Sequence, residues 1–170
     1  MSPKVALSVS IALLGGVAAV LFLTQGLFLW AGFIAWAAFF GAGGDHAALK
    51  KTIAGNLFGV LWAWVALLTI ELVHVGGWLW IPRDGIVIGL TVLVLGLASR
   101  VELLSPIPAS IYGYAAMFAA ASMAHPDVAF IQRLTGFHQY NPFLNVAVSM
   151  VGGAVFGLAS SKLAGALQRP

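Results

Sequence analysis

The chain has 170 residues, of which 61% are hydrophobic and only 8% are charged, and its formal net charge at pH 7 is +3. Soluble domains usually carry about 25% charged residues, because a surface in contact with water needs them. Eight basic and five acidic residues cannot solvate the surface of a whole domain, so the composition excludes an ordinary soluble domain and predicts an integral membrane protein.

Six apolar segments are candidates for helical spans, which need about 20 residues to cross the hydrocarbon core. We expect them at residues 5–23, 27–42, 53–75, 85–99, 107–124 and 143–167. The second and the fourth are short, so they either pack inside a bundle or are re-entrant segments that do not cross. The first is longer than the apolar core of a typical secretory signal, which favours a span over a cleaved leader. The sequence therefore predicts one membrane domain over residues 1–170.

The connections between these segments differ in length and polarity. Residues 24–26 are so few that the first two segments should be antiparallel neighbours. Pro106 and Pro108 predict the start of the fifth helix near Pro106, since proline is favoured in a first turn, and this start lies within or close to the membrane. Residues 125–141 mix apolar and polar side chains as a short amphipathic helix on the outer surface would, or as a cap over an external vestibule.

The basic residues predict the orientation, because cytoplasmic loops carry an excess of lysine and arginine. A cytoplasmic N-terminus gives six basic residues inside and two outside, whereas the reverse orientation gives two and six. Both termini are therefore expected in the cytoplasm. The inside set is Lys4, Lys50, Lys51, Arg100, Lys162 and Arg169, and the outside set is Arg83 and Arg133. Aromatic rings suited to the outer interface are Trp78, Trp80 and residues 137–140.

An internal repeat is predicted from two matched segments. Residues 36–40 and 114–118 both read aromatic, alanine, alanine, any residue, phenylalanine, and each is followed by a glycine-rich segment with an asparagine near its start. The three apolar segments within residues 5–75 thus match the three within residues 85–167 in their order and in the type of residues that they contain. Because each copy has three spans, the second copy is upside down. We expect an all-α integral membrane protein built as two inverted three-span repeats, a plan that places transport sites near the midplane.

The repeat and one acidic residue supply the candidates for a solute pathway. Aromatic residues from the matched segments would form a slot for a small flat solute, or would serve only in packing and lipid contact. Asn56 and Asn145 would line the path, or only join helices through hydrogen bonds. Glu71 would line an outer mouth, or remain an interfacial carboxylate, solvated or paired with His74 or Arg83. The full set is Trp36, Phe39, Phe40, Asn56, Glu71, Tyr112, Tyr114, Phe118 and Asn145.

Enzymatic and nucleic-acid functions find little support in the residues. The motifs of zinc peptidases, nucleophile-elbow hydrolases and phosphate-binding loops are missing from the sequence, and the four histidines are dispersed. No cysteine is present, and five acidic residues leave little material for acid–base catalysis. Basic residues do not gather with aromatic ones as in nucleic-acid binders. We therefore expect no enzyme, no cofactor, no metal centre and no nucleic-acid partner.

Residues 33–40, 55–59 and 108–115 together resemble the bacterial inner-membrane family called domain of unknown function 1097. The resemblance covers nearly the whole chain and implies a multi-pass protein of the bacterial inner membrane, without implying an activity. A weaker similarity to the urea-transporter fold rests on the short aromatic segment, the proline-started segment and the pair Asn141-Pro142. The chain is about half the length of such proteins, so a slot would need the internal repeat or a homodimer.

These observations favour a membrane channel or facilitator for a small polar solute, such as urea, an amide or ammonia. Scarce buried charge favours passive passage, because proton-coupled carriers usually hold more carboxylates and histidines within the membrane. The alternative is a membrane scaffold or accessory subunit without a pathway of its own. A large lipid-facing perimeter around a small interior also predicts a homo-oligomer. A continuous polar path would favour transport, and a dry, filled centre would favour the scaffold.

Overall fold

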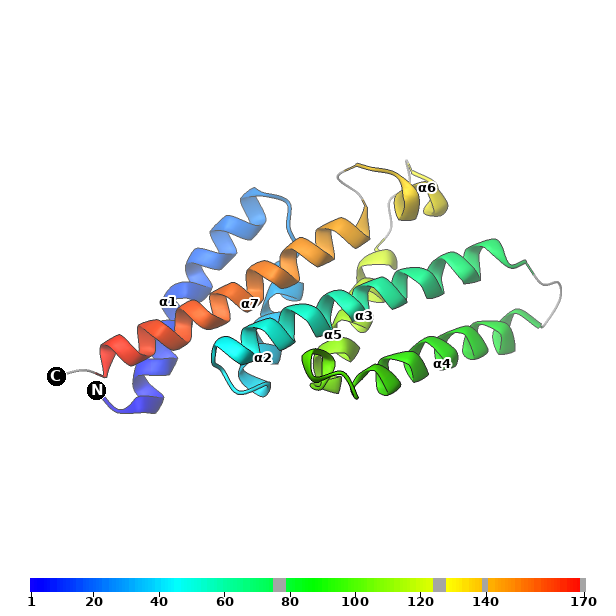
Figure 1. Ribbon diagram of the computed structural model, residues 1–170. Coiled ribbons are helices and arrows are strands. Elements are labelled where there is room, and N and C mark those ends of the chain that lie inside the picture. Colours follow the sequence, from blue (N-terminus) through cyan, green and yellow to red (C-terminus); the bar gives the residue numbers. More distant parts are fainter. Residues whose placement is uncertain (75–78, 124–127, 139–140, 169–170) are drawn as a thin grey trace.

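The computed structural model describes residues 1–74, 79–123, 128–138 and 141–168, and within these ranges every regular element is a helix (Figure 1). Expectations for Trp78, His125, Tyr140, Arg169 and the side chain of Trp80 lie outside the described residues. Among the described residues there are seven α-helices and one short 3-10 helix, named α1 Pro3–Thr24, α2 Leu29–Gly41, α3 His46–Leu72, α4 Trp80–Ala98, η2 Glu102–Leu104, α5 Ile107–Ala121, α6 Phe130–Thr135 and α7 Pro142–Leu167.

Four of these helices, α1, α3, α4 and α7, are long and apolar enough to cross a membrane. The expectation that the fourth segment is short was wrong, because α4 begins at Trp80 and has 19 residues. Pro82 is compatible with this start, because proline is favoured near the N-terminus of a helix. The charges of Arg83 and Asp84 offset each other in an ion pair, with Nη2 of Arg83 2.6 Å from Oδ1 of Asp84. The second segment is short as predicted, with 13 residues in α2, and α5 is also short, with 15.

Helix α3 begins seven residues before the expected span, at His46 rather than at residue 53. Asp45 caps it, because the carboxylate Oδ1 accepts a hydrogen bond of 2.7 Å from the backbone N–H of Ala48. Lys50 and Lys51 are therefore helical residues at the end of a long apolar helix. Of the polar residues 43–52 between the second and third apolar segments, only residues 43–45 connect helices, because residues 46–52 already belong to α3.

Two long helices, α3 and α7, hold the bundle together. The short helix α5 packs mainly against α3, and the short helix α2 packs mainly against α7, while α4 and α1 pack on the outer sides of α3 and α7 respectively (Figure 1). The start of α1 and the end of α7 lie at the same end of the bundle, where Pro3, Leu7, Ala164 and Gln168 line a common cavity (Figure 1).

Glycines bring the backbones of these helix pairs into contact. A Cβ added at Gly59 would overlap the carbonyl oxygen of Ser110 and would lie 2.7 Å from the amide nitrogen of Tyr114. A Cβ added at Gly153 would overlap the carbonyl oxygen of Gly32 in the same way. Small residues permit such close approach, which is how helices associate when lipid removes the hydrophobic force between them.

The short helix α6 covers the end of the bundle opposite the start of α1 (Figure 1). Arg133 of α6 is only 6% exposed and donates hydrogen bonds to the carbonyl of Ala121 (3.2 Å), the last residue of α5, and to that of Met123 (2.9 Å), two residues further on. A cation at a helix C-terminus interacts favourably with the helix dipole. The carbonyl of Leu134 accepts a bond of 2.8 Å from the indole of Trp64 on α3. The predicted short helix is therefore present as a six-residue cap.

Candidate functional site

Three buried polar residues lie where the start of α5 packs closely against α3. Thr52 and Asn56 lie one turn apart on α3, and Ser110 lies in the first turn of α5. All three are at most 1% exposed. A Cβ added at Gly55 would lie 3.3 Å from the amide nitrogen of Ser110, and one added at Gly113 would lie 2.9 Å from the Cα of Asn56. We call Thr52, Asn56 and Ser110 the α3–α5 polar cluster.

The side-chain polar atoms of this cluster have no hydrogen-bond partner in the part of the chain that the structure describes. These atoms are both amide atoms of Asn56, Nδ2 and Oδ1, and the hydroxyl oxygens of Thr52 and Ser110. An unpaired buried polar group costs about 1–3 kcal/mol, so native proteins rarely retain one without a reason. The cluster offers hydrogen-bond donors and acceptors side by side, and none of its three side chains carries a charge.

A further polar pair lies one turn along α5. Tyr114 is buried, and its hydroxyl oxygen is 2.8 Å from the hydroxyl oxygen of Thr91 on α4. On the other side of the cluster, Lys51 precedes Thr52 and lines a cavity at the end of the bundle. Polar groups therefore follow the contact between α3 and α5 from the basic end of the bundle toward its interior.

The corresponding contact between α2 and α7 contains polar groups that are all paired. The indole nitrogen of Trp36 donates to the hydroxyl of Ser160 (3.0 Å), and the carbonyl of Ser160 accepts from Ser10 (2.9 Å). The backbone N–H of Phe28 donates to the hydroxyl of Ser149 (2.9 Å). Apart from Nε of Arg133, unpaired buried side-chain atoms among the described residues are thus confined to the α3–α5 polar cluster.

The candidate aromatic residues of α2 pack mainly against α7. Trp36 stacks on Phe156 of α7 with ring centroids 5.8 Å apart, and Phe40 packs against the same group of side chains. Phe39 is fully buried, and a Cβ added at Gly157 would lie 2.7 Å from its ring. These side chains hold α2 against α7.

The candidate aromatic residues of α5 belong to a different group of side chains. Tyr114 and Phe118 lie 5.0 Å apart by ring centroids and pack in the larger core, whereas Tyr112 is 41% exposed. The six aromatic residues therefore do not face one another across a single slot, because Tyr112 points outward and the others are divided between two clusters. Their part in a solute pathway stays a prediction.

The two asparagines do not occupy matching depths in their helices. Asn56 lies ten residues after the first residue of α3, whereas Asn145 lies three residues after the first residue of α7. Asn145 is half-buried, its carbonyl accepts a bond of 2.6 Å from the hydroxyl of Ser149, and it has further interactions. Only Asn56 belongs to the α3–α5 polar cluster, and the part of both asparagines in a solute pathway stays a prediction.

Glu71 is the second-last residue of α3 and is half-buried. Arg83, one of its expected partners, instead pairs with Asp84 and donates to the carbonyl of Val73. The ring of His74 lies 3.3 Å from the carbonyl of Leu72. No ion pair to Glu71 occurs among the described residues. Glu71 is therefore a carboxylate without an ionic partner in that part of the chain, placed at the end of α3.

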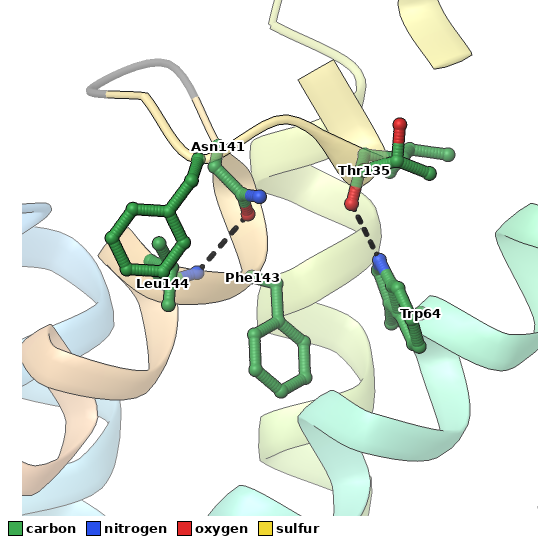
Figure 2. A pocket seen from close by; sticks show the side chains of 7 residues that line it. Trp64, Thr135, Asn141, Phe143 and Leu144 are labelled. Atoms are coloured by element: carbon green, nitrogen blue, oxygen red, sulfur yellow. Dashed lines mark hydrogen bonds between the residues drawn. The ribbon is translucent and has the colours of Figure 1, made fainter. Parts of the chain in front are cut away.

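A small cavity of about 180 Å³ lies between α3 and the start of α7, next to α6 (Figure 2). Asn141 caps α7, with its Oδ1 accepting from the N–H of Leu144 (3.2 Å) and its Nδ2 donating to the carbonyl of Gly136 (2.7 Å). The indole of Trp64, also in the wall, donates to α6. Because these polar groups are already paired, the cavity is mainly apolar. Its lining is Trp64, Leu134, Thr135, Phe137, Asn141, Phe143 and Leu144.

Thr52 and Ser110 are not among the candidate residues predicted from the sequence. Their only signal was spacing, since Thr52 lies four residues before Asn56, and Ser110 lies four residues before Tyr114. The described residues contain no group of three histidine, cysteine or acidic side chains that could hold a metal ion.

The chain matches the model of one protein family, described as a protein of unknown function (DUF1097), over residues 8–165. The family resemblance predicted from the sequence is therefore confirmed. No curated protein and no solved structure matches the chain. The similarity to the urea-transporter fold stays a prediction.

Proposed function

The chain belongs to the DUF1097 family, and we propose that it is a multi-pass membrane channel or facilitator for a small polar solute of the urea, amide or ammonia kind. The observation that carries this proposal is the α3–α5 polar cluster, with four buried polar atoms that have no partner among the described residues. A small solute with both donors and acceptors satisfies these atoms in turn. A neutral solute fits better than an ion, because burying a charge without a counter-charge is far more costly.

The proposed path follows the polar groups along α3 and α5. It passes the α3–α5 polar cluster and continues to the hydroxyls of Tyr114 and Thr91. The backbones of α3 and α5 touch at Gly59 and Gly113, so passage requires these helices to move apart. The four cavities described for this chain lie at the ends or on the periphery, and Asn56 lines none of them.

We further propose that the six longer helices form two inverted three-span repeats. In support, the short helix of each half packs against the last long helix of the other half. Gly32 lies four residues before Trp36, and Ser110 lies four residues before Tyr114, so aligning the matched segments places Gly32 opposite Ser110. The carbonyl of Gly32 faces Gly153, and the carbonyl of Ser110 faces Gly59, so the two close contacts occur at equivalent positions of the aligned segments. Such repeats are common among transporters.

The proposed location is the bacterial inner membrane with both termini in the cytoplasm. The family resemblance suggests the membrane, and the distribution of basic residues suggests the orientation. Five basic residues lie at or near the end of the bundle where α1 begins and α7 ends, and two lie at the opposite end. The first five are Lys4, Lys50, Lys51, Arg100 and Lys162, and the other two are Arg83 and Arg133.

A second candidate function is a scaffold or accessory subunit, favoured by an apolar groove on the outer surface. The groove has a volume of about 480 Å³ and lies between α3 and α7. Alanine and glycine in its wall allow a helix of a partner, or of a second copy of this chain, to approach closely. Its lining is Leu57, Ala147, Val148, Val151 and Gly152.

Stopped-flow light scattering on proteoliposomes tests the proposal with urea, acetamide, glycerol, ammonium and acetate against empty liposomes. We expect faster relaxation for one neutral solute, and loss of that acceleration in Asn56→Leu and Ser110→Ala. Ser149→Ala is the matched control, because Ser149 is equally buried but lies outside the cluster. Acceleration unaffected by the cluster variants would place the path elsewhere, and no acceleration for any solute would favour the scaffold.

A further inference from the structure

A cavity of about 450 Å³ lies between the first turns of α3 and the 3-10 helix η2. It is at the end of the bundle where α3 begins, next to the connection from α4 to α5. For helices that cross a membrane, this end lies at the level of the lipid headgroups. The lining residues are Ala47, Lys50, Lys51, Val101, Glu102 and Leu103.

The charge of this cavity is positive. Lys50 and Lys51 both line it, and Glu102 is the single acidic residue in the lining. The Nζ of Lys51 is 3.5 Å from the carboxylate of Glu102, whose side chain is 91% exposed. An ion pair as exposed as this one contributes little, because water screens it. Lys50 has no ion pair within the described part of the chain.

Apolar side chains stand next to these lysines. Val101 is 56% exposed and Leu103 is 47% exposed, and both belong to the cavity wall. A free inorganic anion makes no use of exposed apolar side chains. An amphiphile with a phosphate group and hydrocarbon chains matches both the cations and the apolar wall.

We propose that this cavity binds the phosphate headgroup of an anionic membrane lipid. Lys50 and Lys51 hold the phosphate, and the first part of the acyl chains lies along Val101 and Leu103. Basic pockets between spans on the cytoplasmic side bind anionic headgroups in this way. The inference needs only that the chain resides in a membrane, so it stands apart from the proposed solute passage.

Native mass spectrometry of the chain in a neutral detergent measures retention of phosphatidylglycerol against phosphatidylcholine with the same acyl chains. We expect selective retention of phosphatidylglycerol. The double variant Lys50→Gln with Lys51→Gln should weaken it about 30-fold, since each lysine near an anionic lipid contributes about fivefold. Lys162→Gln is the matched control, because it is an exposed lysine at the same end of the bundle outside the cavity.

Glu102→Gln should strengthen retention of phosphatidylglycerol, because it removes the single negative charge from the lining. Equal retention of the two lipids, or an equal loss in Lys162→Gln and the double variant, would overturn the proposal. Inorganic phosphate should not displace the lipid at equal concentration, and displacement would assign the cavity to a free phosphate instead. Solute flux through proteoliposomes should be measured on the same variants, because unchanged flux with lost lipid retention separates this site from the proposed pathway.

Discussion

Replacing Gly59 by alanine tests whether the backbones of α3 and α5 touch. The added Cβ would overlap the carbonyl oxygen of Ser110 and lie 2.7 Å from the amide nitrogen of Tyr114. Ordinary contact at such a position is 3.4 Å or more, so the helices must separate by at least about 0.7 Å (3.4 minus 2.7). Overpacking of this kind costs about 1–3 kcal/mol, and backbone atoms cannot rotate away as a side chain can. We therefore take the upper end of this range, about 3 kcal/mol, and a gain in helix propensity of about 1 kcal/mol leaves an expected net loss near 2 kcal/mol.

The matched control is Gly89→Ala on α4, where an added Cβ meets nothing within 4 Å. It receives the same gain in helix propensity without the clash. Thermal unfolding in a mild detergent, followed by tryptophan fluorescence, should show Gly59→Ala melting roughly 4–8 °C below the wild type. Gly89→Ala should melt at the wild-type temperature or above. Equal melting temperatures for the two variants would refute the contact between these helices.

Substitutions at three other contacts test how the bundle is closed. Arg133→Gln should speed hydrogen–deuterium exchange in α6 and at the end of α5, because two carbonyls lose a charged donor; unchanged exchange would contradict that cap. Trp36→Phe and Ser160→Ala should each lower the stability by about 1 kcal/mol, and the double variant should lose little more; full additivity in thermal unfolding would argue against their hydrogen bond. Tyr114→Phe should lower the melting temperature by removing the bond to Thr91, and an unchanged value would count against that bond.

The helices could be predicted from the sequence, whereas two of their boundaries could not. Hydropathy identifies residues that suit lipid, but a helix continues wherever its polar residues find partners. Asp45 caps α3 ahead of Lys50 and Lys51, and the pair of Arg83 with Asp84 lets α4 begin before its apolar run. Both helices are therefore longer than their apolar segments.

Only one residue of the α3–α5 polar cluster could be predicted. Asn56 stands out because an amide is rare in an apolar run. Hydroxyl groups give no such signal, since in helices they usually bond to a carbonyl of the preceding turn, as Thr69 does with Val65. Thr52 and Ser110 lack such a partner, and only the packing of α5 on α3 shows it.

The face that each aromatic residue presents could not be predicted from the sequence either, and the part of these residues in a solute pathway stays a prediction. A repeated motif gives residue types, but the face that each residue presents depends on which helix packs against it. Tyr112 is exposed, while Tyr114 two residues later is buried against α4. Trp36 and Tyr114, which occupy the same position in the repeated motif, do share one feature: each forms a hydrogen bond with a hydroxyl group of another helix.

The central claim is that small water-soluble molecules reach the α3–α5 polar cluster. The chain has no cysteine, so Ser110→Cys introduces a single thiol there with little change in shape. In membranes, a small methanethiosulfonate reagent should modify this thiol, and the transported solute should protect it. Ala116→Cys, a fully buried position on the same helix, should remain unmodified. Modification of Ser110→Cys that the solute slows is the predicted result, and a thiol as inert as that of Ala116→Cys would contradict the account.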